Sequence, residues 1–122
     1  MVKILKLWLP VLLWAGLIFF LSGIPDLKTN LEYDFVLRKA GHVFEYFIFT
    51  FLLYRAFRGS FKLNALGLIA LPAFCALVYA CSDEWHQLFV PGRCCCVKDV
   101  FIDSIGIILF YAVLKCQRRR AG

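Results

Sequence analysis

The chain has 122 residues, of which 62% are hydrophobic and 18% are charged, and its formal net charge at pH 7 is +6. A soluble domain is about half apolar, so this composition and the mean hydropathy of +0.78 exclude an ordinary water-soluble domain. The length fits a single domain.

Two long stretches contain no charged residue. Residues 7–25 and 63–82 are 19 and 20 residues long, and each can cross a hydrocarbon core of about 30 Å as an α-helix. Lys3 and Lys6 precede the first stretch, as in a signal peptide, but its bulky aromatic residues and the lack of a small-residue cleavage site predict a retained helix. We therefore expect membrane spans at about 5–24 and 63–82.

Two further apolar segments carry acids. Residues 40–57 contain His42 and Glu45, and residues 100–116 contain Asp103. A charge at the bilayer centre costs about 2.5–3.5 kcal/mol on insertion scales, so each acid should lie near a helix end and face protein or water. The prediction is an all-α, polytopic membrane protein with a bundle of four transmembrane helices.

The charges divide unequally between the two sides of such a bundle. The N-terminus, the segment 55–62 and the C-terminus carry nine Lys and Arg residues and no acid, which gives +9, while the other side carries all eight acids and sums to −3. Lys and Arg collect in the cytoplasm, so we expect both termini inside the cell in a multi-pass protein of the cell membrane. The positive net charge thus reports topology and does not indicate a nucleic-acid partner.

Polar side chains recur at one depth of this bundle, near the outer leaflet. They come from the first turns of the second span, the last turns of the third and the first turns of the fourth. Ionisable groups inside a membrane are costly and most often mark functional sites. We therefore predict one extracytoplasmic site with these catalytic residues: His42, Glu45, Asp83, His86 and Asp103. The predicted substrate-binding residues of this site are Lys39, Tyr46, Gln87, Arg93 and Asp99.

Proton transfer needs a histidine that a carboxylate orients. His42 would be oriented by Glu45 or Asp103. His86 would be oriented by Asp83 if the third helix continues beyond its span. A metal ion on His42, Glu45, His86 and the acids is the less favoured alternative, because the His-x-x-Glu spacing reverses the Glu-x-x-His of di-iron bundles. No metal site is therefore predicted, and the cofactor is unidentified.

Phosphate binding and close packing account for other positions. Arg and Lys bind phosphate through charge and paired donors, for which Lys39 and Arg93 are suited. Asp99, Asp103 and Gly106 share one helix face, and Gly106 would let a neighbouring helix or a ligand approach closely.

Each feature also has a structural alternative. His42 and Glu45 could bond only to each other and hold two helices together. Asp103 could serve as the salt-bridge partner of a nearby cation. Asp83 and Glu84 could be solvated loop acids, which for Glu84 is the favoured interpretation.

The order and spacing of three motifs resemble the VanZ-like family over nearly the whole chain, as a single domain 1–122. The family is named for a protein associated with low-level resistance to teicoplanin, a glycopeptide antibiotic that acts on cell-wall precursors outside the membrane. The resemblance implies an integral membrane protein of bacterial type. The motifs are Lys39-x-x-His42-x-x-Glu45-Tyr46, Asp83-Glu84-x-His86-Gln87-x-Phe89-x-Pro91-Gly92-Arg93 and Asp99-x-x-x-Asp103-x-x-Gly106.

Three functions fit these observations. The first is a membrane-embedded enzyme of the outer leaflet that transfers or hydrolyses a phosphoryl or glycosyl group of a lipid-linked or cell-envelope substrate. The second is a non-enzymatic binder or transport helper for an anionic envelope lipid, and the third is a structural membrane subunit. The paired histidines and acids favour the enzyme. The expected partners are membrane lipids and a lipid-linked cell-wall precursor.

Overall fold

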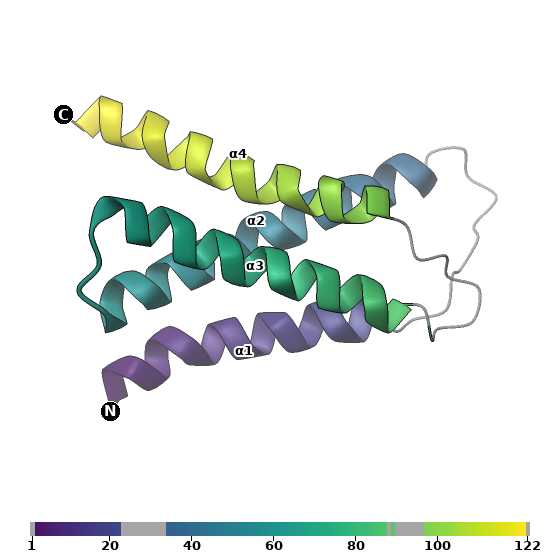
Figure 1. Ribbon diagram of the computed structural model, residues 1–122, viewed down its shortest axis with the longest axis horizontal. Helices are drawn as coiled ribbons and strands as arrows, with labels where there is room; N and C mark the ends of the chain where they lie inside the picture. The colour runs from purple at the N-terminus through teal and green to yellow at the C-terminus, as the bar shows by residue number, and fades with distance from the viewer. Residues whose placement is uncertain (1, 23–33, 88, 90–96, 122) are drawn as a thin grey trace.

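The computed structural model describes residues 2–22, 34–87, 89 and 97–121. The described residues form four α-helices and no strand, as Figure 1 shows. The all-α fold with four helices is therefore confirmed. The helices are α1 (Val2–Ser22), α2 (Asp34–Ser60), α3 (Ala65–Gln87) and α4 (Val97–Ala121).

The four helices run alternately up and down. Both chain termini and the short connection between α2 and α3 lie at one end of the bundle (Figure 1). We call this the basic end, because the nine cations that lack an acidic neighbour in sequence belong to it. The opposite end, where α1 and α3 finish and α2 and α4 begin, is called the acidic end.

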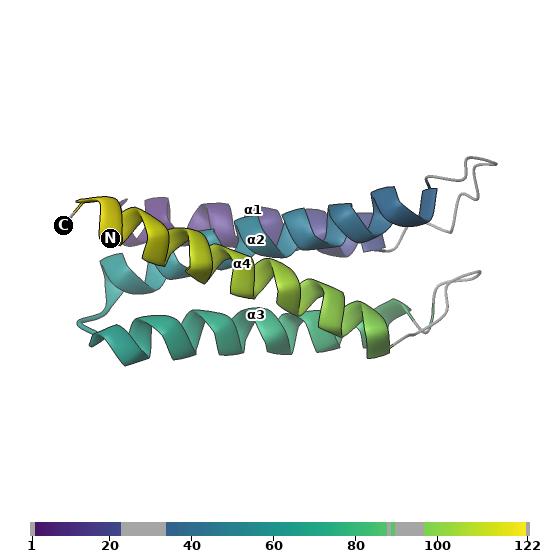
Figure 2. The same ribbon diagram turned by 90° about the horizontal axis from the view of Figure 1, so that it is seen from above.

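Helix α2 is the centre of the bundle. It contacts each of the other three helices, and its most extensive interface is with α4. Seen from above, α1 and α2 lie in one layer and α3 in another, with α4 crossing between them (Figure 2).

Three of the four helices are long and apolar enough by themselves to cross a membrane, namely Val2–Leu21, Ala65–His86 and Val100–Ala121. Helix α2 is not among them, because His42, Glu45 and Arg55 interrupt its apolar stretch. A helix that neighbours shield from lipid can be more polar than one that faces hydrocarbon on most of its surface. The central position of α2 thus explains why the second predicted span has the weakest hydropathy signal.

The bundle has apolar side chains outside and several polar ones inside. Large hydrophobic residues are exposed along α1, α3 and α4, whereas Thr50, Asp83, Glu84 and Asp103 are buried. This distribution suits a hydrocarbon environment, where exposed apolar surface has no cost and polar groups turn inward. Examples of the exposed apolar residues are Leu12, Leu13, Phe20, Phe74, Phe101 and Ile108.

Close helix packing at one point depends on a glycine. A Cβ atom on Gly106 of α4 would collide with the carbonyl oxygen of Val43 and lie 3.0 Å from the backbone nitrogen of Phe47. Small residues allow such backbone contact in membrane bundles. The expectation of a close approach at Gly106 is confirmed, and the approaching group is the backbone of α2.

Aromatic donors tie α1 to its neighbours. The Trp14 indole nitrogen donates to the backbone oxygen of Glu45 at 2.9 Å, and Tyr79 of α3 donates to the backbone oxygen of Ala15. At the basic end, the indole of Trp8 donates to the hydroxyl of Ser60 at 2.8 Å. Polar atoms in hydrocarbon need internal partners, so these bonds fix the position of α1 beside α2 and α3.

Candidate functional site

Helix α3 extends far enough to carry predicted site residues at the acidic end. The helix continues without a break through Gln87, so Asp83, Glu84 and His86 lie on helical turns. No glycine or proline interrupts the sequence between Pro72 and Gln87, and nothing local would end the helix there. The condition for a shared polar face on α3 is met, and the alternative that Asp83 and Glu84 are loop acids is excluded.

Three carboxylates are buried at this end. Asp103 of α4 is 0% exposed, and Asp83 and Glu84 of α3 are each 4% exposed. The expectation that Glu84 is a solvated acid is therefore wrong. Its position four residues after Ala80 and eight after Ala76, both 0% exposed, places it on the packed face of α3.

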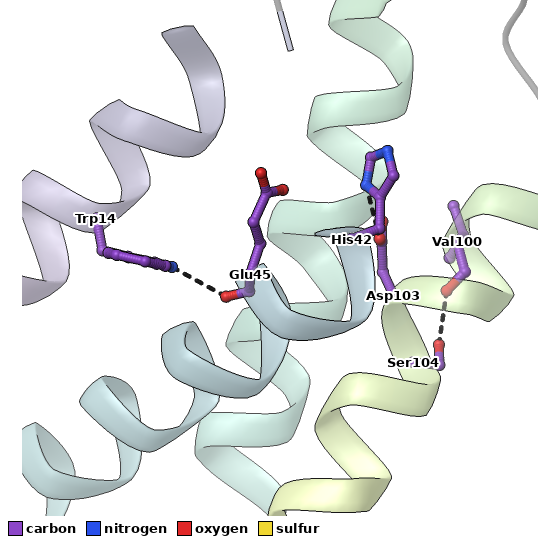
Figure 3. Close-up of polar contacts among 6 residues, drawn as sticks. All are labelled: Trp14, His42, Glu45, Val100, Asp103 and Ser104. Atoms are coloured by element: carbon purple, nitrogen blue, oxygen red, sulfur yellow. Dashed lines mark hydrogen bonds and ion pairs between the residues drawn. The ribbon is translucent and has the colours of Figure 1, made fainter. Parts of the chain in front are cut away.

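Helices α2 and α4 meet in an ion pair. The Nδ1 atom of His42 lies 3.1 Å from Oδ1 of Asp103, with the two side chains 16% and 0% exposed. The atoms are at ion-pair distance without the alignment of a hydrogen bond. Figure 3 shows Asp103 reaching the His42 ring from α4, while the Glu45 carboxylate rises from α2 beside them. Of the two partners expected for His42, the structure gives Asp103 at Nδ1.

Tyr46 lies near acids from three helices. Its side chain is 0% exposed and lies within electrostatic range of Asp103, Asp83 and Glu45. Among the described residues its hydroxyl has no hydrogen-bond partner. Buried hydroxyl groups are normally hydrogen-bonded, so the Tyr46 hydroxyl is a buried polar atom that a further group could contact. We call His42, Glu45, Tyr46, Asp83 and Asp103 the acid–histidine cluster.

The second histidine has a different neighbour. The ring of His86 packs on the ring of Phe19 in α1, with centroids 4.1 Å apart and an angle of 33° between the planes. The aromatic contact of His86 is thus with α1. The predicted pairing of His86 with Asp83 stays a prediction.

The remaining predicted residues divide into two groups. Lys39 lies in the second turn of α2, one turn before His42, and its side chain is half-buried. Gln87 and Asp99 lie on α3 and α4, but their side chains are outside the described part of the structure, as is the whole of Arg93. Their predicted roles in substrate binding stay predictions.

None of the predicted site residues lies on α1. In the structure α1 contributes Phe19, on which His86 packs, and Trp14, whose indole holds the backbone of Glu45. No charged residue of α1 lies at this depth, so charge patterning could not indicate these contacts. The aromatic residues themselves were the available signal, since Trp often finds a hydrogen-bond partner when buried.

Within residues 2–22, 34–87, 89 and 97–121, no three His, Cys, Asp or Glu side chains form a group that could hold a metal ion. The acid–histidine cluster itself offers carboxylates, an imidazole and a phenol.

Comparison with known proteins identifies relatives over most of the chain. The model of the VanZ/LLP1 family matches residues 7–118. The chain is also 36% identical over 104 residues to the uncharacterized membrane protein YwnJ of Bacillus subtilis (strain 168), with 79% of this chain and 67% of that protein covered. No solved structure matches the chain. This chain is therefore a membrane protein of the VanZ/LLP1 family, as the extent of the family match, the bacterial relative and the apolar helices together show.

Proposed function

We propose that the acid–histidine cluster is the catalytic centre of a membrane enzyme that acts in the outer leaflet. Its substrate would be a lipid-linked, phosphate-containing molecule of the cell envelope, and the reaction a phosphoryl or glycosyl transfer or hydrolysis. The observation that carries this proposal is the pair of His42 and the fully buried Asp103, 3.1 Å apart. His42 belongs to α2, the central helix, and Asp103 belongs to α4, and Asp83 of α3 would complete the centre.

The pair favours one protonation state of the imidazole. A carboxylate beside Nδ1 favours a proton on that nitrogen, which places the lone pair of the neutral ring on Nε2. His42 would then accept a proton at Nε2 and become an imidazolium that Asp103 stabilises. Catalytic hydrogen bonds are often poorly aligned without substrate and tighten when it binds, which suits the present ion-pair geometry.

The other members of the cluster would assist in distinct ways. Tyr46 would donate a hydrogen bond from its hydroxyl, because that atom lies among the acids without a partner in the described chain. Asp83 and Glu45 would supply further proton acceptors near the reacting group. Water and solutes outside the cell could reach His42, which is 16% exposed.

The substrate class follows from the membrane setting and from the cations. A lipid-linked substrate would reach the acidic end by moving laterally in the bilayer, and its phosphate would need positive charge there. Lys39 lies one turn toward that end from His42, and Arg93 would add a bidentate donor. The link of the family name to glycopeptide resistance supports a cell-envelope substrate, since such antibiotics act on cell-wall precursors outside the membrane.

The test is turnover by the purified full-length chain in phosphatidylcholine vesicles that contain a polyprenyl diphosphate or a polyprenyl-diphosphate-linked sugar. Release of inorganic phosphate reports phosphoryl chemistry, and loss of the sugar reports glycosyl chemistry. We expect Asp103→Asn and His42→Gln each to lower kcat by about 10²–10⁴-fold, the usual contribution of general acid–base catalysis.

Ser104→Ala is the matched control, because Ser104 follows Asp103 directly and its hydroxyl bonds the backbone oxygen of Val100 in its own helix. This variant should keep wild-type turnover. If Asp103→Asn and Ser104→Ala lowered kcat equally, the His42–Asp103 pair would have no special part in the reaction. If the wild-type chain bound both lipids and turned over neither, the enzyme proposal would give way to a lipid-binding function.

A further inference from the structure

A hollow lies between α2 and α4 in the half of the molecule nearer the basic end. Its volume is about 430 Å³, within the range of roughly 300–1,000 Å³ that is usual for ligand pockets. The walls are almost entirely apolar, and two polar side chains stand at one end. The apolar walls include Phe47, Phe51, Phe110 and Val113, and the polar residues at the end are Arg58 and Gln117.

The length of this groove matches one leaflet of a bilayer. On α2 its lining runs from Phe47 to Arg58, eleven residues apart, which is about 16 Å along a helix axis. Half of a hydrocarbon core is about 15 Å. The groove can also be entered from the side, because Phe51 and Val113 are exposed on the outer surface of the bundle.

The charged mouth of the groove is at the basic end. Arg58 lies on the last turn of α2, and the Arg118 guanidinium donates to the hydroxyl of Tyr54, another lining residue, at 2.7 Å. The cations of this end have no acidic neighbour on the described last turns of α2 and α4. Basic pockets between membrane helices on the cytoplasmic side bind anionic lipid headgroups.

We propose that this groove binds a glycerophospholipid with an anionic headgroup. One acyl chain lies between α2 and α4 along Phe47, Phe51 and Val113, and the phosphate meets Arg58 at the membrane surface. Arg donates paired hydrogen bonds to phosphate oxygens, and Gln117 adds an amide donor. This site is separate from the acid–histidine cluster and does not depend on the function proposed for that cluster.

Native mass spectrometry of the purified full-length chain tests the proposal. The protein in mild detergent is mixed with equal amounts of dioleoyl phosphatidylglycerol and dioleoyl phosphatidylcholine, and the retained lipid is counted. We expect one phosphatidylglycerol to be retained in preference to phosphatidylcholine. Arg58→Gln should lower that preference about fivefold, the effect of removing one cation near an anionic headgroup.

Two further variants separate the groove from the general charge of the basic end. Arg55→Gln removes an exposed cation one turn earlier on α2 that does not line the groove, and it should leave the preference unchanged. Val113→Trp places a large ring in the groove from an exposed position and should reduce retention of both lipids, with helical content checked by circular dichroism.

Equal retention of the two lipids by the wild-type chain would overturn the proposal. So would equal loss of preference in Arg55→Gln and Arg58→Gln, because the basic end as a whole would then attract the lipid. Since no acid–histidine cluster residue is altered, these results are independent of any turnover measurement.

Discussion

The two ends of the bundle place their charges in opposite ways. At the acidic end the carboxylates of Asp83, Glu84 and Asp103 are inside the bundle, shielded by neighbouring helices. At the basic end Arg119 and Arg120 point outward from the last turn of α4 and are exposed. Charged side chains are thus packed within the bundle at one end and exposed at the other.

The solvation free energy that a charged side chain loses differs between the two ends. An exposed Arg near the membrane surface extends its charged head into water and loses little solvation. A buried carboxylate loses several kcal/mol of solvation, to order of magnitude, and needs partners in return. The exposed cations need no explanation beyond topology and lipid contact. The buried acids need a functional or strong structural reason, and for Asp83 and Asp103 the function proposed for the acid–histidine cluster would be such a reason.

The largest expected effect concerns the direction in which the bundle lies in the membrane. If the basic end is cytoplasmic, green fluorescent protein fused after Gly122 will fluoresce, and alkaline phosphatase fused there will be inactive, because positively charged segments stay inside. The readout is cell fluorescence and phosphatase activity in intact cells. The reverse pattern would place the acid–histidine cluster in the cytoplasm and remove the basis for an extracytoplasmic substrate.

Sequence patterns predicted the features that depend on one helix at a time. Hydropathy and charge gave the number of helices, and the absence of a helix breaker allowed α3 to carry its acids on helical turns through Gln87. The i, i+4, i+7 spacing on α4 put Asp103 and Gly106 on one face, and both meet α2 in the structure.

Features that depend on the rotation of one helix against another were harder to predict. His42 had two possible acid partners, because the sequence does not fix which face of α4 meets α2. The packing of His86 on Phe19 depends on the position of α1, which has no charged residue near that level to mark its inner face. Glu84 was misjudged because its neighbour Asp83 already occupied the expected polar face, although Ala80 one turn earlier indicated a packed surface.

A second prediction compares the removal of one charge at each end. Asp103→Ala should lower the free energy of unfolding by about 3 kcal/mol or more, because it leaves His42 without its buried partner. Arg119→Gln should cause no measurable change, because that side chain is exposed. Denaturant unfolding in detergent, followed by circular dichroism, measures both. Similar losses in the two variants would mean that burial does not distinguish the two ends energetically.

The last prediction compares one glycine from each half of the bundle. A Cβ atom at Gly106 would strike the backbone of Val43 and Phe47, which cannot move without separating α4 from α2. The three atoms nearest to a Cβ atom at Gly59, near the basic end, all belong to the side chain of Leu7, and the end of a flexible side chain can rotate away. We expect Gly106→Ala to cost about 1–3 kcal/mol of stability, the range for overpacking in a filled core.

Gly59→Ala should be neutral or slightly stabilising, because alanine is favoured over glycine inside a helix by up to about 1 kcal/mol. The thermal midpoints of both variants in the same detergent provide the comparison. Gly106→Ala should also weaken the contact between His42 and Asp103, since it pushes α4 from α2 one turn below that pair. A Gly106→Ala variant as stable as Gly59→Ala would show that α2 and α4 can separate at little cost, and the geometry of the acid–histidine cluster would then not be held by backbone packing.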